Sequence, residues 1–163
     1  MSKKNELFSI QKHESVEIHY VFNLQVDGET RSWAVPKGPS PDPRVKRLAI
    51  PIANEVAMDF EGVEGTENKR VIVWDSGEYS TYELDGEPLP AAESLNEGKL
   101  EFWIEGKKLA GGFTLLRIDG GANERWLLMK MTDEMATSRR NPVMTEPLSV
   151  VSGKDIEDVT LDE

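Results

Sequence analysis

Apolar and polar residues alternate along much of this chain with the two-residue period that is typical of β-strands. The clearest stretch is Val16–Val26, in which every second side chain is apolar. Asp27-Gly28 predicts a tight turn after it, and residues 30–35 predict the returning strand. A further strand-like segment follows the polar first six residues. Other segments with strand patterns are 48–52, 70–74, 78–82, 99–104, 113–118 and 126–131.

Helical patterns are few. Residues 90–96 predict a short helix that ends at Gly98, and residues 133–140 predict one or two more helical turns. Glycines such as the pair Gly111-Gly112 stand between short strand segments, where they predict hairpin turns. Glycine at this density between short strands favours a barrel or a sandwich. We therefore expect a mainly β fold with one or two short helices.

Length and composition indicate one domain, because 163 residues allow one substantial core. No apolar run approaches the roughly 20 residues that span a bilayer, and the N-terminus lacks the apolar stretch of a signal peptide. The chain has no cysteine, which excludes disulfides and a thiol nucleophile. A cytoplasmic location fits these features. We expect a flexible N-terminus at residues 1–6, a single domain at 7–153 and an acidic tail at 154–163.

The net charge of −11 argues against non-specific coating of DNA, because such binding depends on a basic surface. It leaves room for a small basic pocket that holds one phosphate. The sequence has no Walker-type phosphate loop, no GxSxG, no HExxH and no dinucleotide fingerprint.

The only two histidines, His13 and His19, are the strongest candidates for chemistry. A neutral imidazole is a common ligand for transition metals. Alternation along a strand places His19, Val21 and Asn23 on one face, opposite the apolar face that contains Tyr20. From spacing alone, two histidines six residues apart are more often unrelated than joined by a metal.

A series of motifs changes this estimate. The longest is Ser32–Ser40, with the sequence SWAVPKGPS. Others, in chain order, are QKH at 11–13, IHYVFNL at 18–24, KRLA at 46–49, VIVWDSG at 71–77 and WLLMK at 126–130. Together they resemble the 3′-phosphoesterase domain of bacterial DNA ligase D, over about residues 7–153. The resemblance implies a compact β-barrel and manganese-dependent removal of 3′-phosphates and terminal ribonucleotides from DNA ends during end joining.

The resemblance also implies a metal site. His13 and His19 match two metal-ligating histidines of the family, and they are the candidate catalytic residues. Glu55 occupies the position of a further active-site histidine. His13, His19 and Glu55 are therefore the expected ligands of manganese or another divalent metal, since two imidazoles and a carboxylate form a recognised ligand set.

Phosphate contacts follow from the same comparison. Lys37 and Arg47 match two basic residues of the family and are expected to bind phosphate. Asn23 stands where the family has a phosphate-binding arginine, and it is a third candidate contact. Val21 stands where the family has an aspartate metal ligand, so that ligand is absent here.

These replacements predict weak or no catalytic activity, because a single positioned group typically contributes on the order of 2.7–4 kcal/mol to transition-state stabilisation. Two alternatives stay open. One is an active phosphoesterase with a rebuilt site of His13, His19 and Glu55, and the other is a non-catalytic interaction module. The expected partners are DNA 3′ ends, bound with low affinity because of the net charge, and DNA ligase or polymerase proteins. No membrane partner is expected.

Overall fold

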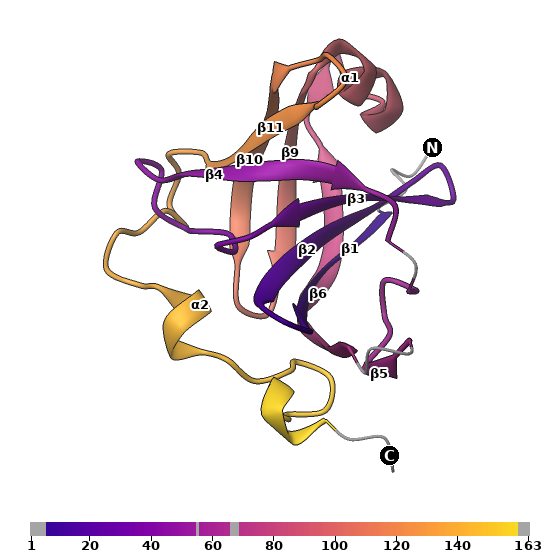
Figure 1. Cartoon of the computed structure of the whole chain (residues 1–163). Coiled ribbons are helices and arrows are strands. Elements are labelled where there is room, and N and C mark those ends of the chain that lie inside the picture. The colour runs from indigo at the N-terminus through magenta and orange to yellow at the C-terminus, as the bar shows by residue number, and fades with distance from the viewer. Residues whose placement is uncertain (1–5, 55, 66–68, 160–163) are drawn as a thin grey trace.

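Within the described residues, eight antiparallel strands form a closed barrel (Figure 1). The computed structural model describes residues 6–54, 56–65 and 69–159. The strand order is β1-β2-β3-β4-β11-β10-β9-β6, and β6 pairs with β1 to close the barrel. The bounds are β1 Glu6–Glu14, β2 Ile18–Val26, β3 Glu29–Val35, β4 Lys46–Ile52, β6 Lys69–Thr81, β9 Lys99–Gly106, β10 Ala110–Asp119 and β11 Arg125–Lys130. The expected mainly β barrel is confirmed.

Shorter elements lie at the two ends of the barrel. They are β5 (Gly62–Glu64), β7 (Glu83–Leu84), β8 (Glu87–Pro88), α1 (Ala91–Glu97), α2 (Pro142–Thr145) and the 3-10 turn η1 (Ile156–Asp158). In Figure 1, α1 covers one end, and α2 and η1 lie beyond the other. The helix expected at 90–96 is confirmed as α1, and Gly98 ends it in the left-handed conformation at φ 91°. No helix in the described part of the chain is long and apolar enough to cross a membrane.

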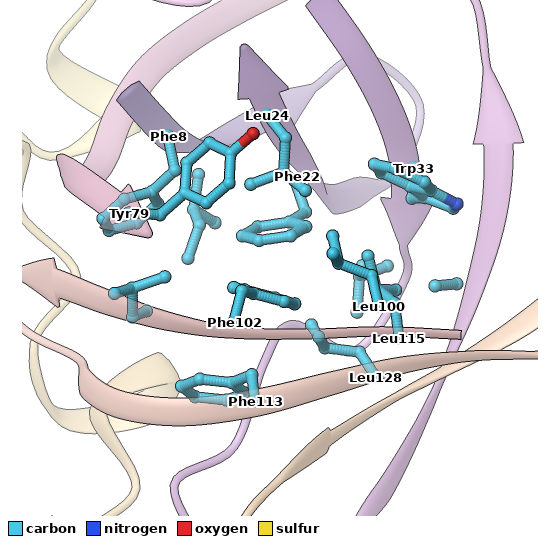
Figure 2. Close-up of a cluster of buried hydrophobic side chains, with 14 of the residues drawn as sticks. Phe8, Phe22, Leu24, Trp33, Tyr79, Leu100, Phe102, Phe113, Leu115 and Leu128 are labelled. Atoms are coloured by element: carbon cyan, nitrogen blue, oxygen red, sulfur yellow. The ribbon is translucent and has the colours of Figure 1, made fainter. Parts of the chain in front are cut away.

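Large apolar side chains fill the barrel interior (Figure 2). One side chain in two points inward along each strand, so that Tyr20, Phe22 and Leu24 of β2 enter the core. Phe22 stacks on Phe102 with ring centroids 5.7 Å apart. Because the interior of so small a barrel is filled by side chains, a functional site must lie on its outer surface or at its ends.

The β9–β10 turn is tied to the barrel wall by Asp75 of β6. Its fully buried carboxylate accepts the backbone N–H groups of Ser76 (3.0 Å), Lys107 (2.8 Å), Lys108 (3.1 Å) and Leu109 (2.9 Å). Burial raises the pKa of Asp75, and these hydrogen bonds to the charged form oppose the rise. The carboxylate therefore fixes the turn that carries Lys107 and Lys108.

Two local expectations about strands and turns are wrong. The segments 70–74 and 78–82 form one strand, β6, whose ladder with β1 continues across a bulge. Gly111-Gly112 is not a turn but lies within β10. A Cβ atom on Gly112 would come 2.5 Å from the hydroxyl oxygen of Tyr82, so glycine permits close packing there.

The helix expected at 133–140 is also absent from the structure. Asp133 accepts the N–H of Met135 (2.9 Å) and the N–H of Gly112 (2.9 Å), and it forms an ion pair with Lys130. These bonds favour a side-chain-stabilised turn over a helix. The helix forms further on, where Pro142 occupies the first helical position of α2.

The described part of the C-terminal tail packs on the barrel. Ile156 and Val159 are buried against Ile72, and Val63 packs beside them. Residues 160–163 and 1–5 lie outside the described residues.

Candidate functional site

His13 and His19 face each other on the outer side of the β1–β2 hairpin. They are direct partners in the antiparallel register, and their ring centroids are 5.3 Å apart with a tilt of 45°. The outward direction follows from alternation, because Phe8 and Ile10 of β1 point into the core. The structure thus brings together the two histidines that the sequence singled out.

Both imidazoles are held in the neutral form. His13 is 2% exposed, and burial, reinforced by Lys69 and by His19, lowers its pKa to about 3. Burial and then Lys69 also lower the pKa of His19, while Glu17 opposes this shift. Nε2 of His13 is buried and has no hydrogen-bond partner among the described residues. A neutral ring with an unpartnered nitrogen is the form of histidine that binds metals.

The histidine pair fits part of the ligand set of a divalent transition metal. The described residues contain no group of three or more histidine, aspartate and glutamate side chains placed to hold a metal ion. Glu55, the expected third ligand, lies outside the described residues. Val21, two positions after His19, offers no donor atom. The described part of the chain therefore supplies two neutral ligands, and the metal and catalytic roles of His13 and His19 stay predictions.

A buried polar network occupies the outer face beside the histidines. Its centre is Asn23, which is 0% exposed. The Asn23 side chain forms four hydrogen bonds: it donates to Oγ of Ser9 (3.1 Å) and Oε1 of Gln11 (3.0 Å), and it accepts from Oγ of Ser32 (2.6 Å) and Nδ2 of Asn54 (3.1 Å). Both N–H groups and both lone pairs of the amide are thus used within the protein. The predicted contact of Asn23 with phosphate stays a prediction.

The same network fastens Asn54 and residues 56–60 to side chains of β1 and β2. Gln11 donates to the backbone carbonyls of Ala57 (3.0 Å) and Phe60 (3.1 Å), and Ser9 donates to that of Met58 (2.6 Å). Val21, the register partner of Gln11, is 0% exposed. The strand face on which the resemblance implies a metal-binding aspartate and a phosphate-binding arginine is therefore closed to solvent.

The two predicted basic contacts lie apart from the network. Lys37 is exposed in the loop that leaves β3, and Val35, the last residue of β3, pairs with Tyr20, the neighbour of His19. Arg47 lies in β4 in register with Leu128 and shares the inward face with the buried Ala49. Its Nε is buried without a partner among the described residues. Their phosphate contacts stay predictions.

Comparison with known proteins decides the family. A model described as the DNA ligase D 3′-phosphoesterase domain matches residues 11–117. The chain belongs to this family.

Two curated relatives of this 3′-phosphoesterase-family domain are long multifunctional proteins. The multifunctional non-homologous end joining protein LigD of Pseudomonas aeruginosa is 37% identical over 158 residues, which cover 91% of this chain and 18% of the relative. The multifunctional non-homologous end joining DNA repair protein LigD of Mycobacterium tuberculosis is 30% identical over 133 residues, which cover 78% of this chain and 16% of the relative. The chain therefore spans less than a fifth of the length of either protein.

The sequence reasoning missed the polar network around Asn23. A signal for it exists in β1, where Ser9, Gln11 and His13 alternate with the core residues Phe8 and Ile10. Uncharged side chains that can both donate and accept hydrogen bonds recur there at every second position. Such a row suits a covered face better than a solvated one, because buried polar groups must satisfy one another.

Proposed function

We propose that this 3′-phosphoesterase-family domain serves end-joining repair at DNA 3′ ends with weak or no phosphoesterase activity. The relation to end-joining repair follows from the family and its relatives. One observation carries the reduced activity: Val21 and Asn23 are fully buried, and Asn54 and Ala57 are hydrogen-bonded to Asn23 and Gln11 on this strand face. A substrate phosphate reaches that face only if Asn54 and Ala57 move away. A cytoplasmic location, and cooperation with DNA ligase or polymerase proteins, are part of the proposal.

Opening the face costs free energy. Five hydrogen bonds join Ser9, Gln11 and Asn23 to Asn54 and to residues 56–60. Each bond contributes about 0.5–1.5 kcal/mol net, so the open state lies several kcal/mol above the closed state in free energy and is sparsely populated. Opening also exposes the apolar side chain of Val21. Both terms support a closed resting state.

His13 and His19 are the residues that would hold a divalent metal, manganese by the family resemblance. A metal bound there supplies Lewis-acid polarisation of a phosphoryl oxygen. Because both imidazoles are already neutral, they lose no proton on binding at neutral pH. The described residues around them place no carboxylate at position 21 and no guanidinium at position 23, which supports a weak site.

The test is a cleavage assay with manganese. The substrates are primer–templates that end in a 3′-phosphate or a 3′-terminal ribonucleotide, and the products are separated on a gel. The matched control is His19→Ala, and the corresponding domain of the Pseudomonas aeruginosa relative is the reference. We expect turnover close to that of His19→Ala and at least about 100-fold below the reference, the loss that one missing oxyanion-type donor typically causes. Turnover near the reference that His19→Ala abolishes would overturn the proposal.

The unpartnered Nε2 of His13 favours one alternative, an active site rebuilt from His13, His19 and Glu55. Calorimetric titration with manganese or zinc distinguishes it. A rebuilt site requires that His13→Ala and Glu55→Ala each weaken metal binding. Unchanged affinity in Glu55→Ala would exclude the glutamate as a ligand.

A further inference from the structure

Basic residues gather at one end of this acidic protein. The cationic rim, defined here as residues 36–47, 106–110 and 130–146, contains nine basic and four acidic residues, a formal net charge of +5. The rest of the chain contains 10 basic and 26 acidic residues, a net charge of −16. The basic members are Lys37, Arg44, Lys46, Arg47, Lys107, Lys108, Lys130, Arg139 and Arg140. Charge on this protein is therefore strongly segregated.

The three segments of the cationic rim lie together in space. The N–H of Thr137 donates to the carbonyl of Pro41 (2.9 Å), and Nζ of Lys108 donates to the carbonyls of Glu146 (2.8 Å) and Leu148. A pocket of about 230 Å³ is lined by residues from all three segments, including Lys107 and Arg140. In Figure 1 the loop after β3, the β9–β10 turn and the chain leading into α2 gather at the α2 end of the barrel.

Four basic side chains from the second and third rim segments fall into two groups. Lys108 is held by backbone carbonyls, and Arg140 pairs with Glu146 at 2.9 Å, so both belong to the frame of the pocket. Lys107 and Arg139 are exposed, and neither forms an ion pair with another residue in the described part of the chain. These two cations are available to an external anion.

We propose that the cationic rim binds the phosphate backbone of a DNA strand and that its pocket takes one of the phosphates. Cation–phosphate contacts supply the sequence-independent part of DNA affinity. The −16 charge of the remaining chain repels the same backbone, which confines the strand to the rim and limits its affinity. The inference rests on the proposed function and deepens it by assigning the surface that holds the strand.

The register of the barrel connects the cationic rim with the histidine pair. The first rim segment leaves β3 directly after Val35, which pairs with Tyr20, and His19 precedes Tyr20 in β2. The rim segment 36–47 therefore starts beside the strand that carries His19. A DNA strand lying on the rim can present its end to His13 and His19 while its internal phosphates stay on Lys107 and Arg139.

The test is fluorescence anisotropy with a labelled primer–template in the presence of EDTA, so that binding is measured without metal. The rim variant is Lys107→Glu/Arg139→Glu. The matched control, Lys99→Glu/Arg125→Glu, makes the same charge change at exposed residues that begin β9 and β11. We expect the rim variant to lose at least about tenfold in affinity and the control less than about twofold. Removing two phosphate contacts should also reduce the slope of log affinity against log salt by about 1.8.

The outcomes separate this inference from the proposed function. Equal losses in both variants, or no binding by the wild-type protein, would overturn the rim as a DNA surface. A parallel titration with inorganic phosphate identifies the ligand. If the wild-type protein binds free phosphate but no oligonucleotide, and only the rim variant loses the phosphate binding, the rim is not a DNA surface. His13→Ala should keep DNA binding in EDTA and lose manganese binding, whereas the rim variant should do the reverse. A protein that binds DNA on the rim but no manganese would contradict the proposed metal role alone.

Discussion

Replacing Asn23 with aspartate provides the sharpest test of the buried network. The substitution keeps the shape of the side chain but exchanges its N–H donor group for a second oxygen. That oxygen would face Oε1 of Gln11, an acceptor that now lies 3.0 Å from Nδ2 of Asn23. The new carboxylate would also be charged at a position that is 0% exposed. A protonated carboxyl, in contrast, can still donate to Gln11.

The magnitude follows from proton linkage. Burial and the facing acceptor raise the pKa of the new carboxyl above its ordinary value of about 4. Each tenfold rise in proton affinity lowers the free energy of unfolding at pH 7 by about 1.4 kcal/mol. A hundred- to thousandfold rise, which is common for a fully buried carboxyl, gives a loss of about 3–4 kcal/mol. Because the folded pKa is raised, the loss is complete at neutral pH and recovers as the pH falls toward about 4.

Urea unfolding followed by tryptophan fluorescence measures this effect, since Trp33, Trp74 and Trp126 are buried in the core. Wild-type protein and Asn23→Asp are compared at pH 7 and at about pH 4. Asn123→Asp, at an exposed position in the β10–β11 turn, is the control, and it should stay within about 0.5 kcal/mol of wild type at both values. A variant Asn23→Asp as stable as wild type at pH 7, or equally destabilised at both pH values, would refute the account of the network.

Three further predictions concern the histidines and the barrel wall. Val21→Asp should destabilise the protein in EDTA, because it places a carboxylate at a fully buried position. It should also raise the manganese affinity measured by calorimetry, because the carboxylate would lie on the same strand face as His19. Unchanged affinity would show that a donor at position 21 does not reach the metal. Because the pKa of His13 is lowered to about 3, the free energy of unfolding of the wild-type protein should fall by about 1.4 kcal/mol for each pH unit between 6.5 and about 3. Urea unfolding of His13→Gln should lack this contribution to the pH dependence. Parallel pH profiles of the two proteins would contradict a buried neutral imidazole. Asp75→Asn should lower the free energy of unfolding by about 2 kcal/mol or more, because it disrupts the charge-assisted hydrogen bonds between Asp75 and the β9–β10 turn. The control Glu105→Gln, at an exposed position, should change the free energy of unfolding little.

The sequence was sufficient to predict the strands that line the core but not the covering of their outer face. Alternation in residues 18–26 gives β2 and its inward side chains directly. The same alternation places Asn23 on the outward face but does not show that this face is covered. Its burial depends on Asn54 and residues 56–60, whose position on the barrel follows from hydrogen bonds with Gln11 and Ser9 rather than from hydropathy. Polar groups that satisfy one another are buried at little cost, which a hydrophobic pattern does not record.

The histidine pair was more predictable than its surroundings. His13 and His19 stand three residues on either side of Val16, so a symmetric hairpin centred there makes them cross-strand partners. The cationic rim could not be predicted in this way, because it is assembled from segments that are far apart in the sequence. Its segments are separated by about 60 and 20 residues in the chain, and the net charge of −11 averages over them.

The closed barrel also determines the order in which this chain folds. Strands β1 to β4 form one antiparallel meander, and β6, β9, β10 and β11 form a second. Among the described strands, two pairings join the meanders and are called seams below: β1 with β6, where Phe8 pairs with Gly77, and β4 with β11, where Ala49 pairs with Trp126. Pairs so distant in sequence close slowly, because a long loop must be ordered before any seam contact forms. A nascent chain can complete the first meander early, but its edge strand β1 stays unpaired until β6 has been synthesised and its edge strand β4 until β11 has been synthesised. We therefore expect the rate-limiting step of folding to be the docking of two preformed sheets along these seams.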